Sequence, residues 1–222
     1  MKTLLLLIGC LILINLIKRF TGKASVPPPR IHLAPTQAGG RHAGAVAKYG
    51  KELEGCGFRK IGTYRPDPMK GIVLTAFGNP RESLCAIVYT HQVAGSFVDV
   101  VAKSESGRTF TATTAPAGQE LDHREGHEKV YDKSMSVAAM VDLVLKRRPE
   151  GPWASWAHGN FVSQFEKAYA DEMDWRAGRG GVTSDEVRRV AQAGGHTVSE
   201  GDILKATHKI QKEYAESRRD AR

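Results

Sequence analysis

The chain has few of the residues and motifs that carry recognisable chemistry. It contains only three cysteines, Cys10, Cys56 and Cys85. Cys10 lies in an apolar N-terminal stretch and Cys85 in an apolar strand, so we expect reduced thiols and no disulfide framework. No glycine-rich loop follows a strand and opens a helix in the phosphate-binding pattern, and no serine has the surroundings of a nucleophile elbow. The sequence therefore lacks a common catalytic motif.

Acidic residues are missing from the first part of the chain. Residues 1–51 contain eight Lys and Arg and no Asp or Glu. These eight account for the whole net charge of +8, because the remaining 24 Lys and Arg match the 24 Asp and Glu. A nucleic-acid-binding domain needs its own basic surface. The balanced body therefore argues against nucleic acid as a partner.

The N-terminal stretch from Leu4 to Ile17 is apolar apart from one glycine and one asparagine. A straight spanning helix needs about 20 apolar residues. Snorkelling of the Lys18-Arg19 pair and local thinning of the bilayer can make up the difference. We therefore predict a single-pass transmembrane anchor over residues 1–20.

Two alternatives to an uncleaved anchor stay open. A cleaved secretory signal has an apolar run of this length, and residues 22–24 offer small residues to a peptidase. However, the basic pair at residues 18–19 follows the apolar run, whereas a signal places its charge before the run. A lipoprotein signal is suggested by Leu-Ile-Gly-Cys at residues 7–10, although few apolar residues precede this cysteine.

Positive charge is unevenly distributed around the predicted anchor. Lys2 precedes its apolar run, whereas Lys18, Arg19, Lys23 and Arg30 follow that run. The positive-inside rule then places the body on the cytoplasmic side. Basic residues beside a bilayer also attract anionic lipid, so we expect membrane lipid to contact residues 3–30. Residues 21–40 are rich in proline and glycine and predict a linker that separates the body from the bilayer.

Residues 71–114 show the clearest secondary-structure pattern in the chain. Apolar and polar residues alternate in most of this stretch, as in half-buried strands, and residues 84–90 form an almost wholly apolar run typical of a strand covered on both faces. A further strand is expected before this stretch and a short edge strand after it. We expect strands over residues 58–64, 72–77, 84–90, 98–103, 109–114 and 129–132.

Five helices are predicted around these strands. The stretch Thr183-Ser184-Asp185-Glu186 is a capping box that begins one of them. Apolar residues of the last helix fall in a thin stripe, which predicts loose packing or completion by a partner protein. We expect helices over residues 41–53, 136–146, from Asn160 to about residue 175, 184–193 and 199–217.

Asp122, His123 and His127 lie in the densest group of ionisable residues. Imidazole and carboxylate groups are ligands for zinc and other divalent ions, so these three residues are the candidate metal ligands. Gly126 and the β-like residues after it argue against a helix here, and the spacing does not match the metalloprotease helix motif. The alternative interpretation is a solvated loop between the sheet and the next helix.

Asp99 and His91 are polar residues near the apolar strands. A carboxylate beside an imidazole can act as an acid–base pair. The alternation of the strand instead predicts that Asp99 lies on the solvent-facing side together with Lys103. Asp99, His123 and His127 are therefore candidate catalytic residues only if the protein is an enzyme.

We predict an α+β fold in which an antiparallel β-meander of about five strands is covered by helices. Residues 41–180 form this domain, residues 181–222 add a C-terminal helical hairpin, and residues 1–20 form the anchor. The predicted function is a membrane-tethered, non-catalytic binding or scaffolding module with a protein partner and no cofactor. The alternative is a small metal-dependent, hydrolase-like enzyme that uses the loop at residues 122–127.

Overall fold

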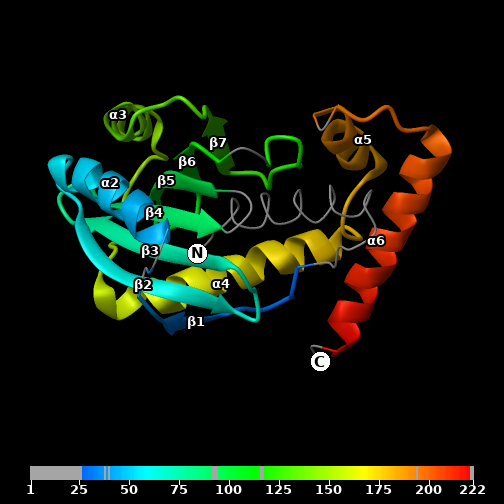
Figure 1. The fold of residues 1–222 in the computed structure, drawn as a ribbon, viewed down its shortest axis with the longest axis horizontal. Helices are drawn as coiled ribbons and strands as arrows, with labels where there is room; N and C mark the ends of the chain where they lie inside the picture. Colours follow the sequence, from blue (N-terminus) through cyan, green and yellow to red (C-terminus); the bar gives the residue numbers. More distant parts are fainter. Residues whose placement is uncertain are drawn as a thin grey trace.

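The computed structural model describes residues 27–37, 39, 41–91, 95–115, 118–193 and 195–220. The predicted anchor over residues 1–20 lies outside these ranges. None of the helices inside them has both the length and the hydrophobicity that a bilayer crossing requires. The described residues form one seven-stranded sheet and five helices (Figure 1). The α+β class is thereby confirmed.

The sheet follows the order of the chain, so that each strand lies beside the next one in sequence. Neighbouring strands are antiparallel except for the last pair, which is parallel. A parallel neighbour requires a connection that returns to the starting end of the previous strand. The strands are β1 (His32–Pro35), β2 (Arg59–Asp67), β3 (Ile72–Asn79), β4 (Leu84–His91), β5 (Gly95–Lys103), β6 (Thr109–Thr113) and β7 (His127–Tyr131).

The sheet is wider than the predicted meander of about five strands. The strands β2 to β6 lie where alternation and, for β4, the apolar run predict them, and β7 begins two residues before the predicted edge strand. The extra strand, β1, falls in the stretch predicted as a linker. Proline is tolerated there because β1 is an edge strand, where one row of backbone groups needs no partner strand.

One face of the sheet is covered by α2 (Arg41–Gly55) and α3 (Val137–Arg147). Ser136 caps α3 by accepting a hydrogen bond from Ala139 N at 3.2 Å. The hydrophobic cluster buried on this face consists of Leu53, Phe58, Phe77, Leu84, Ala86, Val88, Val98, Val100, Ala102, Phe110, Ala112, Val137, Met140, Val141 and Val144.

The opposite face is covered by α4 (His158–Gly178), which runs along the sheet, with α5 (Ser184–Ala193) and α6 (Glu200–Asp220) beside its C-terminal end (Figure 1). The predicted stripe of α6 consists of Ile203, Thr207, Ile210 and Tyr214, each no more than 3% exposed. The stripe is therefore covered within the chain, and α6 needs no partner protein to bury it.

Residues 27–37, which we call the strap, lie against the body. Because β1 pairs with β2, the strap is part of the sheet, and the following Thr36 N donates to Thr63 O at 2.9 Å. Polar contacts join the strap to α4: Tyr169 Oη donates to Pro28 O at 2.6 Å, Arg30 pairs with both carboxylate oxygens of Asp174 at 3.0 Å, Leu33 N donates to Glu166 Oε1 at 2.7 Å, and His32 Nδ1 lies 3.0 Å from the same Glu166 oxygen.

Candidate functional site

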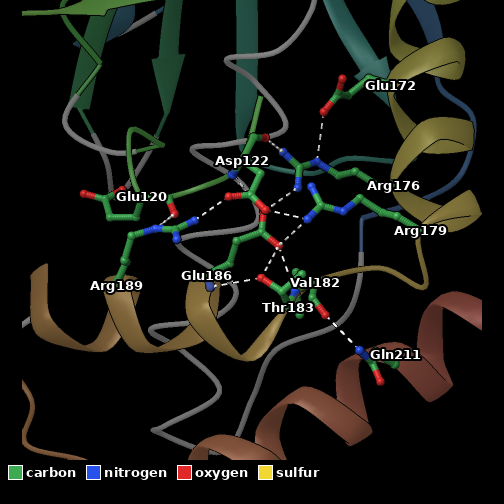
Figure 2. A network of polar contacts seen from close by, with 10 residues as sticks. All are labelled: Glu120, Asp122, Glu172, Arg176, Arg179, Val182, Thr183, Glu186, Arg189 and Gln211. Atoms are coloured by element: carbon green, nitrogen blue, oxygen red, sulfur yellow. Dashed lines mark hydrogen bonds and ion pairs between the residues drawn. The ribbon is translucent and has the colours of Figure 1, made fainter. Parts of the chain in front are cut away.

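Six charged side chains meet where the loop before β7, the end of α4 and the start of α5 come together (Figure 2). Three are arginines and three are carboxylates, so the formal charges balance. We call them the charged cluster: Asp122, Glu172, Arg176, Arg179, Glu186 and Arg189.

Arg176 lies at the centre of the charged cluster and is only 1% exposed. Its Nη1 donates to Glu186 Oε1 at 3.2 Å and its Nη2 to Asp122 O at 3.2 Å. Its Nε lies 2.9 Å from Glu172 Oε1 one turn earlier on α4, without the alignment of a hydrogen bond. One guanidinium thus joins α4, α5 and the loop before β7.

Glu186 is fully buried at the start of α5 and accepts from two backbone segments. Its Oε1 receives Asp122 N at 2.8 Å, and its Oε2 receives Thr183 N at 2.8 Å. Glu186 N in turn donates to Thr183 Oγ1 at 3.2 Å, which confirms the predicted capping box. The carboxylate that begins α5 therefore also fixes the loop before β7.

Asp122 is bound by two arginines on its outer side. Arg179 Nη2 donates to its Oδ2, and Arg189 Nη2 donates to its Oδ1 at 2.6 Å. Burial by itself would raise the pKa of Asp122, but the hydrogen bonds from Arg179 and Arg189 outweigh it and lower the pKa. Asp122 is therefore a charged carboxylate whose two oxygens are both engaged.

The charged cluster holds α4, α5 and the loop before β7 together. Burial raises the pKa of Glu172, and the positive charge of Arg176 opposes this effect. Buried ion pairs recover little net stability, because desolvation of both charges offsets their attraction. Removal of one partner is costly, however, since the other charge remains buried and unpaired. The cluster consequently fixes one arrangement of α4, α5 and the loop.

The structure places the two predicted histidine ligands in different surroundings. His127 is buried at the start of β7, where its Nδ1 lies 2.8 Å from Thr109 Oγ1. His123 has an exposed side chain. Partial desolvation by the surrounding protein and the positive charges of Lys129 and Arg176 nevertheless lower its pKa to about 4, so the imidazole is neutral near pH 7.

The metal hypothesis also requires several ligands around one point. Among the residues that the structure describes, no group of three or more His, Cys, Asp or Glu side chains is arranged to hold a metal ion. Asp122, His123 and His127 contact arginines, solvent and Thr109, respectively. The metal site stays a prediction from sequence.

Asp99 differs from its predicted position on the solvent-facing side. Asp99 and Lys103 are 2% and 4% exposed, and both lie on the α4 face of β5. Lys103 Nζ donates to Gln164 Oε1 on α4 at 3.1 Å. The strand alternates as expected, but α4 and the loop before β7 cover the face that a simple meander would leave in solvent.

Asp99 is an unusual buried carboxyl. Burial raises its pKa to about 7, against the opposing effects of the Lys129 charge and of hydrogen bonds from the Thr113 and Tyr89 hydroxyls. Its Oδ1 is buried and makes no hydrogen bond. His91 does not form a pair with Asp99, because it lies opposite Gly95, four residues or about 13 Å along the strand.

Sequence reasoning missed Arg176 and Glu172 as site residues. The signal was present, because Glu172 interrupts the apolar row that Phe161, Phe165 and Ala168 form on α4. Arg176 continues the same row one turn later. Two opposite charges one turn apart on a buried face indicate a buried ion pair, but their partner Glu186 belongs to another helix, and no pattern within that helix indicates the contact with α4.

The chain shows no significant match to any protein-family model, curated protein sequence or solved structure.

Proposed function

We propose that the protein is a non-catalytic binding or scaffolding module that its N-terminal segment tethers to the cytoplasmic side of a membrane. The observation that carries the non-catalytic part is the state of Asp122. This residue belongs to the loop with the densest ionisable groups, yet both of its carboxylate oxygens are engaged by arginines. A carboxylate in that state is a poor metal ligand and a poor general base, because either role requires it to lose an arginine partner.

The rest of the charged cluster supports the same proposal. Its charges balance, its central guanidinium is buried, and its contacts join segments of the chain to one another. Such a cluster gives a rigid body of defined shape, which a scaffold requires. The tether is supported by the apolar run that ends at Ile17 and by the basic residues after it.

A metal-binding measurement tests the non-catalytic part. We would purify the full chain in detergent, expose it to zinc and manganese, and determine bound metal after desalting. The variant His123→Ala/His127→Ala is compared with His208→Ala, because His208 is exposed on α6 and distant in sequence from the loop. We expect no stoichiometric metal in any of them. Metal that is present in the wild type and in His208→Ala, but absent from the double variant, would overturn the proposal.

A labelling experiment tests the tether and its orientation. Cys85 is buried, and burial raises the pKa of its thiol, so it reacts poorly with maleimides in the folded protein. We would therefore place the reporter at the exposed position Lys133 as Lys133→Cys, with Cys10 and Cys56 replaced by serine. Labelling by an impermeant maleimide only after lysis, with the protein in the membrane fraction, is the expected result. Labelling in intact cells contradicts the orientation, and recovery in the soluble fraction contradicts the tether.

A second candidate function is acid–base catalysis in a small hydrolase-like enzyme, and Asp99 is the observation in its favour. A buried carboxyl with a pKa of about 7 and one oxygen without a hydrogen bond has the properties of a general acid or base. The variant Asp99→Asn separates the two functions. A hydrolase loses its turnover of a chromogenic ester in this variant, whereas a scaffold shows no such turnover in either form and gains stability from the substitution.

A further inference from the structure

The two sides of the sheet differ in where their helices lie. On one side α2 and α3 lie over the middle strands and contact β4, β5 and β6. On the other side α4 contacts β1 and β2, and its Phe161 ring stacks on Tyr64 of β2 with the ring centroids 5.5 Å apart. Adjacent strands are about 4.8 Å apart and a helix is about 10 Å wide, so one helix covers about two strands. Within the described ranges, no helix contacts β4 or β5 to a comparable extent on the α4 side.

The middle strands nevertheless bury apolar side chains on the α4 side. We call these residues of β4 and β5 the β4–β5 face, and each is no more than 2% exposed: Cys85, Ile87, Tyr89, Phe97 and Val101. The Tyr89 and Phe97 rings stack on each other across the two strands, with centroids 4.9 Å apart. Helix α4 meets the face from its edge, where Lys103 reaches Gln164. Side chains buried this deeply on a sheet need a further layer above them.

The chain itself contains a segment suited to form this layer. Of the stretches outside the described ranges, only residues 1–26 are longer than three residues. They include the apolar run from Leu4 to Ile17, which has the same chemical character as the β4–β5 face. As the helix predicted from sequence, this run is about 21 Å long. Strands of eight and nine residues, such as β4 and β5, extend about 27–30 Å, so the run fits along them.

The strap places this segment within reach of the face. Pro28 is fixed to α4 by Tyr169, and α4 borders the β4–β5 face. Residues 18–26 connect the apolar run to the strap, and an extended chain of that length spans up to about 30 Å. That distance is about the width of the seven-stranded sheet. Because the connection is short, the effective concentration of the segment at the face is high, which favours it over an unconnected partner.

We infer that the β4–β5 face is the docking site of the chain's own N-terminal segment, residues 4–17, whenever that segment is not inserted in a membrane. The inserted state rests on the proposed tether, whereas the docked state does not. Both states remove the same apolar side chains from water, so the bilayer and the β4–β5 face compete for one segment. Docking also shields an apolar run that would otherwise promote aggregation before it meets a bilayer.

Photo-crosslinking of the full chain tests the docked state. We would synthesise the protein in a cell-free system without membranes or detergent, and place p-benzoylphenylalanine at position 11, in the middle of the apolar run. The control carries it at position 209, on the exposed side of α6. After irradiation, we expect position 11 to crosslink within its own chain to residues 84–103, and position 209 not to do so. Added vesicles should reduce the crosslink from position 11, because the bilayer takes up the segment.

Two double variants give a matched comparison. Ile87→Ala/Val101→Ala shortens two side chains of the β4–β5 face. Val88→Ala/Val100→Ala shortens two neighbours that point toward α2 and α3. Both variants lose core volume, but only the first should weaken docking, by about tenfold or more. Leu7→Asp changes the N-terminal segment and leaves the body intact, so it should abolish the crosslink even if the double variants fold poorly.

The outcomes distinguish docking from the tether. Crosslinks between two chains would show that the face receives the segment of a second copy, and would overturn docking within one chain. Absence of any crosslink to residues 84–103, or equal losses in the two double variants, also overturns it. A protein that floats with vesicles, but gives no crosslink without lipid, keeps its tether and overturns docking. A protein that crosslinks but does not float keeps docking and overturns the tether. An undiminished crosslink in floated protein overturns the competition between the two states.

Discussion

On the α2–α3 side of the sheet the buried polar side chains of the described residues are uncharged, namely Thr63, Thr75, Asn79 and Thr90, whereas the α4 side buries Asp99, Lys103, Glu172, Arg176 and Glu186 among its core residues. The first side gains its stability from apolar area removed from water, which depends little on direction. The second side buries charges that are tolerated only in one arrangement, because each depends on a particular partner. Apolar burial thus stabilises both sides of the sheet, and the α4 side adds buried charged pairs that fix one arrangement of its segments.

The largest expected effect is on the α4 side, from removal of the central guanidinium. Arg176→Ala leaves Glu172 and Glu186 buried without their partner, so we expect the free energy of unfolding to fall by about 3–5 kcal/mol. Urea unfolding followed by tryptophan fluorescence and circular dichroism measures the loss. The control Arg188→Ala removes exposed pairs with Asp185 and Glu200 and should cost less than about 1 kcal/mol.

The triple variant Glu172→Gln/Arg176→Met/Glu186→Gln sharpens this result. Because it removes all the charges of the central pairs together, it should recover much of the stability that Arg176→Ala loses. Similar losses in the two variants would show that packing of the Arg176 side chain, and not its charge, stabilises this side of the sheet.

The next effect is on the apolar side. Leu53 of α2 is fully buried against the sheet, and Leu53→Ala should reduce the free energy of unfolding by about 3 kcal/mol through lost apolar burial and a residual cavity. The loss should be the same at low and high salt, since no charge is involved. Leu204→Ala, at the exposed leucine of α6, is the matched control and should change stability by less than about 0.5 kcal/mol. A strong salt dependence for Leu53→Ala would contradict the contrast between the two sides.

The third prediction concerns pH, and it rests on Asp99. Its pKa is about 7 in the folded protein and about 3.8 in the unfolded chain, so between these values the folded state binds more protons than the unfolded state. The contribution of Asp99 to the free energy of unfolding is therefore most favourable at low pH and is lost as pH rises from about 4 to about 7. Asp122 acts in the opposite direction, because its pKa is lowered and its stabilisation is lost as pH falls.

The variant Asp99→Asn should remove the decrease in the free energy of unfolding that Asp99 causes as pH rises. Above pH 7 we expect a gain on the order of 2 kcal/mol, which is less than the full pKa shift implies because the amide must also be buried. Unfolding midpoints measured from pH 4.5 to 8 test this expectation. If wild type and Asp99→Asn show parallel pH profiles, the carboxyl is charged in the folded state and the assigned pKa is wrong.

The smallest effect concerns the strap. Tyr169→Phe removes the hydrogen bond to Pro28 O and should cost about 1 kcal/mol. Hydrogen exchange should become faster at the amides of residues 30–36 and remain unchanged at α3. Tyr49→Phe on α2 is the control, because the Tyr49 hydroxyl makes no hydrogen bond within the described part of the chain. Unchanged exchange in the strap of Tyr169→Phe would show that β1 pairing alone fixes it.

Local patterns were sufficient to predict much of the fold. Alternation located β2, β3, β5 and β6, and a continuous apolar run located β4. The capping box located the start of α5, and the stripe from Ile203 to Tyr214 gave the buried side of α6. These signals are local because they depend on the periodicity of one strand or helix. The α6 stripe was nevertheless misjudged as thin, since Thr207 is buried and satisfies its hydroxyl on Ile203 O at 2.8 Å.

Contacts between distant segments account for what was missed. Prolines around β1 predict an extended linker, but pairing with β2 makes it a strand, and the partners Glu166 and Asp174 on α4 hold it as a strap. Asp99 was assigned to the solvent side because alternation gives two faces without saying which one a later helix covers. The charged cluster joins residues from three segments, and no single segment carries its pattern.

The strap has a consequence for biosynthesis. Pro28 and its partner Tyr169 are 141 residues apart in the chain. At a synthesis rate of roughly 5–20 residues per second, the N-terminal segment leaves the ribosome roughly 7–28 s before α4 is available to hold the strap. During this interval the strap has no α4 to contact, and β2 is the only one of its partners that has been synthesised early. Docking of the strap on α4 is therefore a late tertiary contact in the order of synthesis, although the strap lies near the start of the described chain.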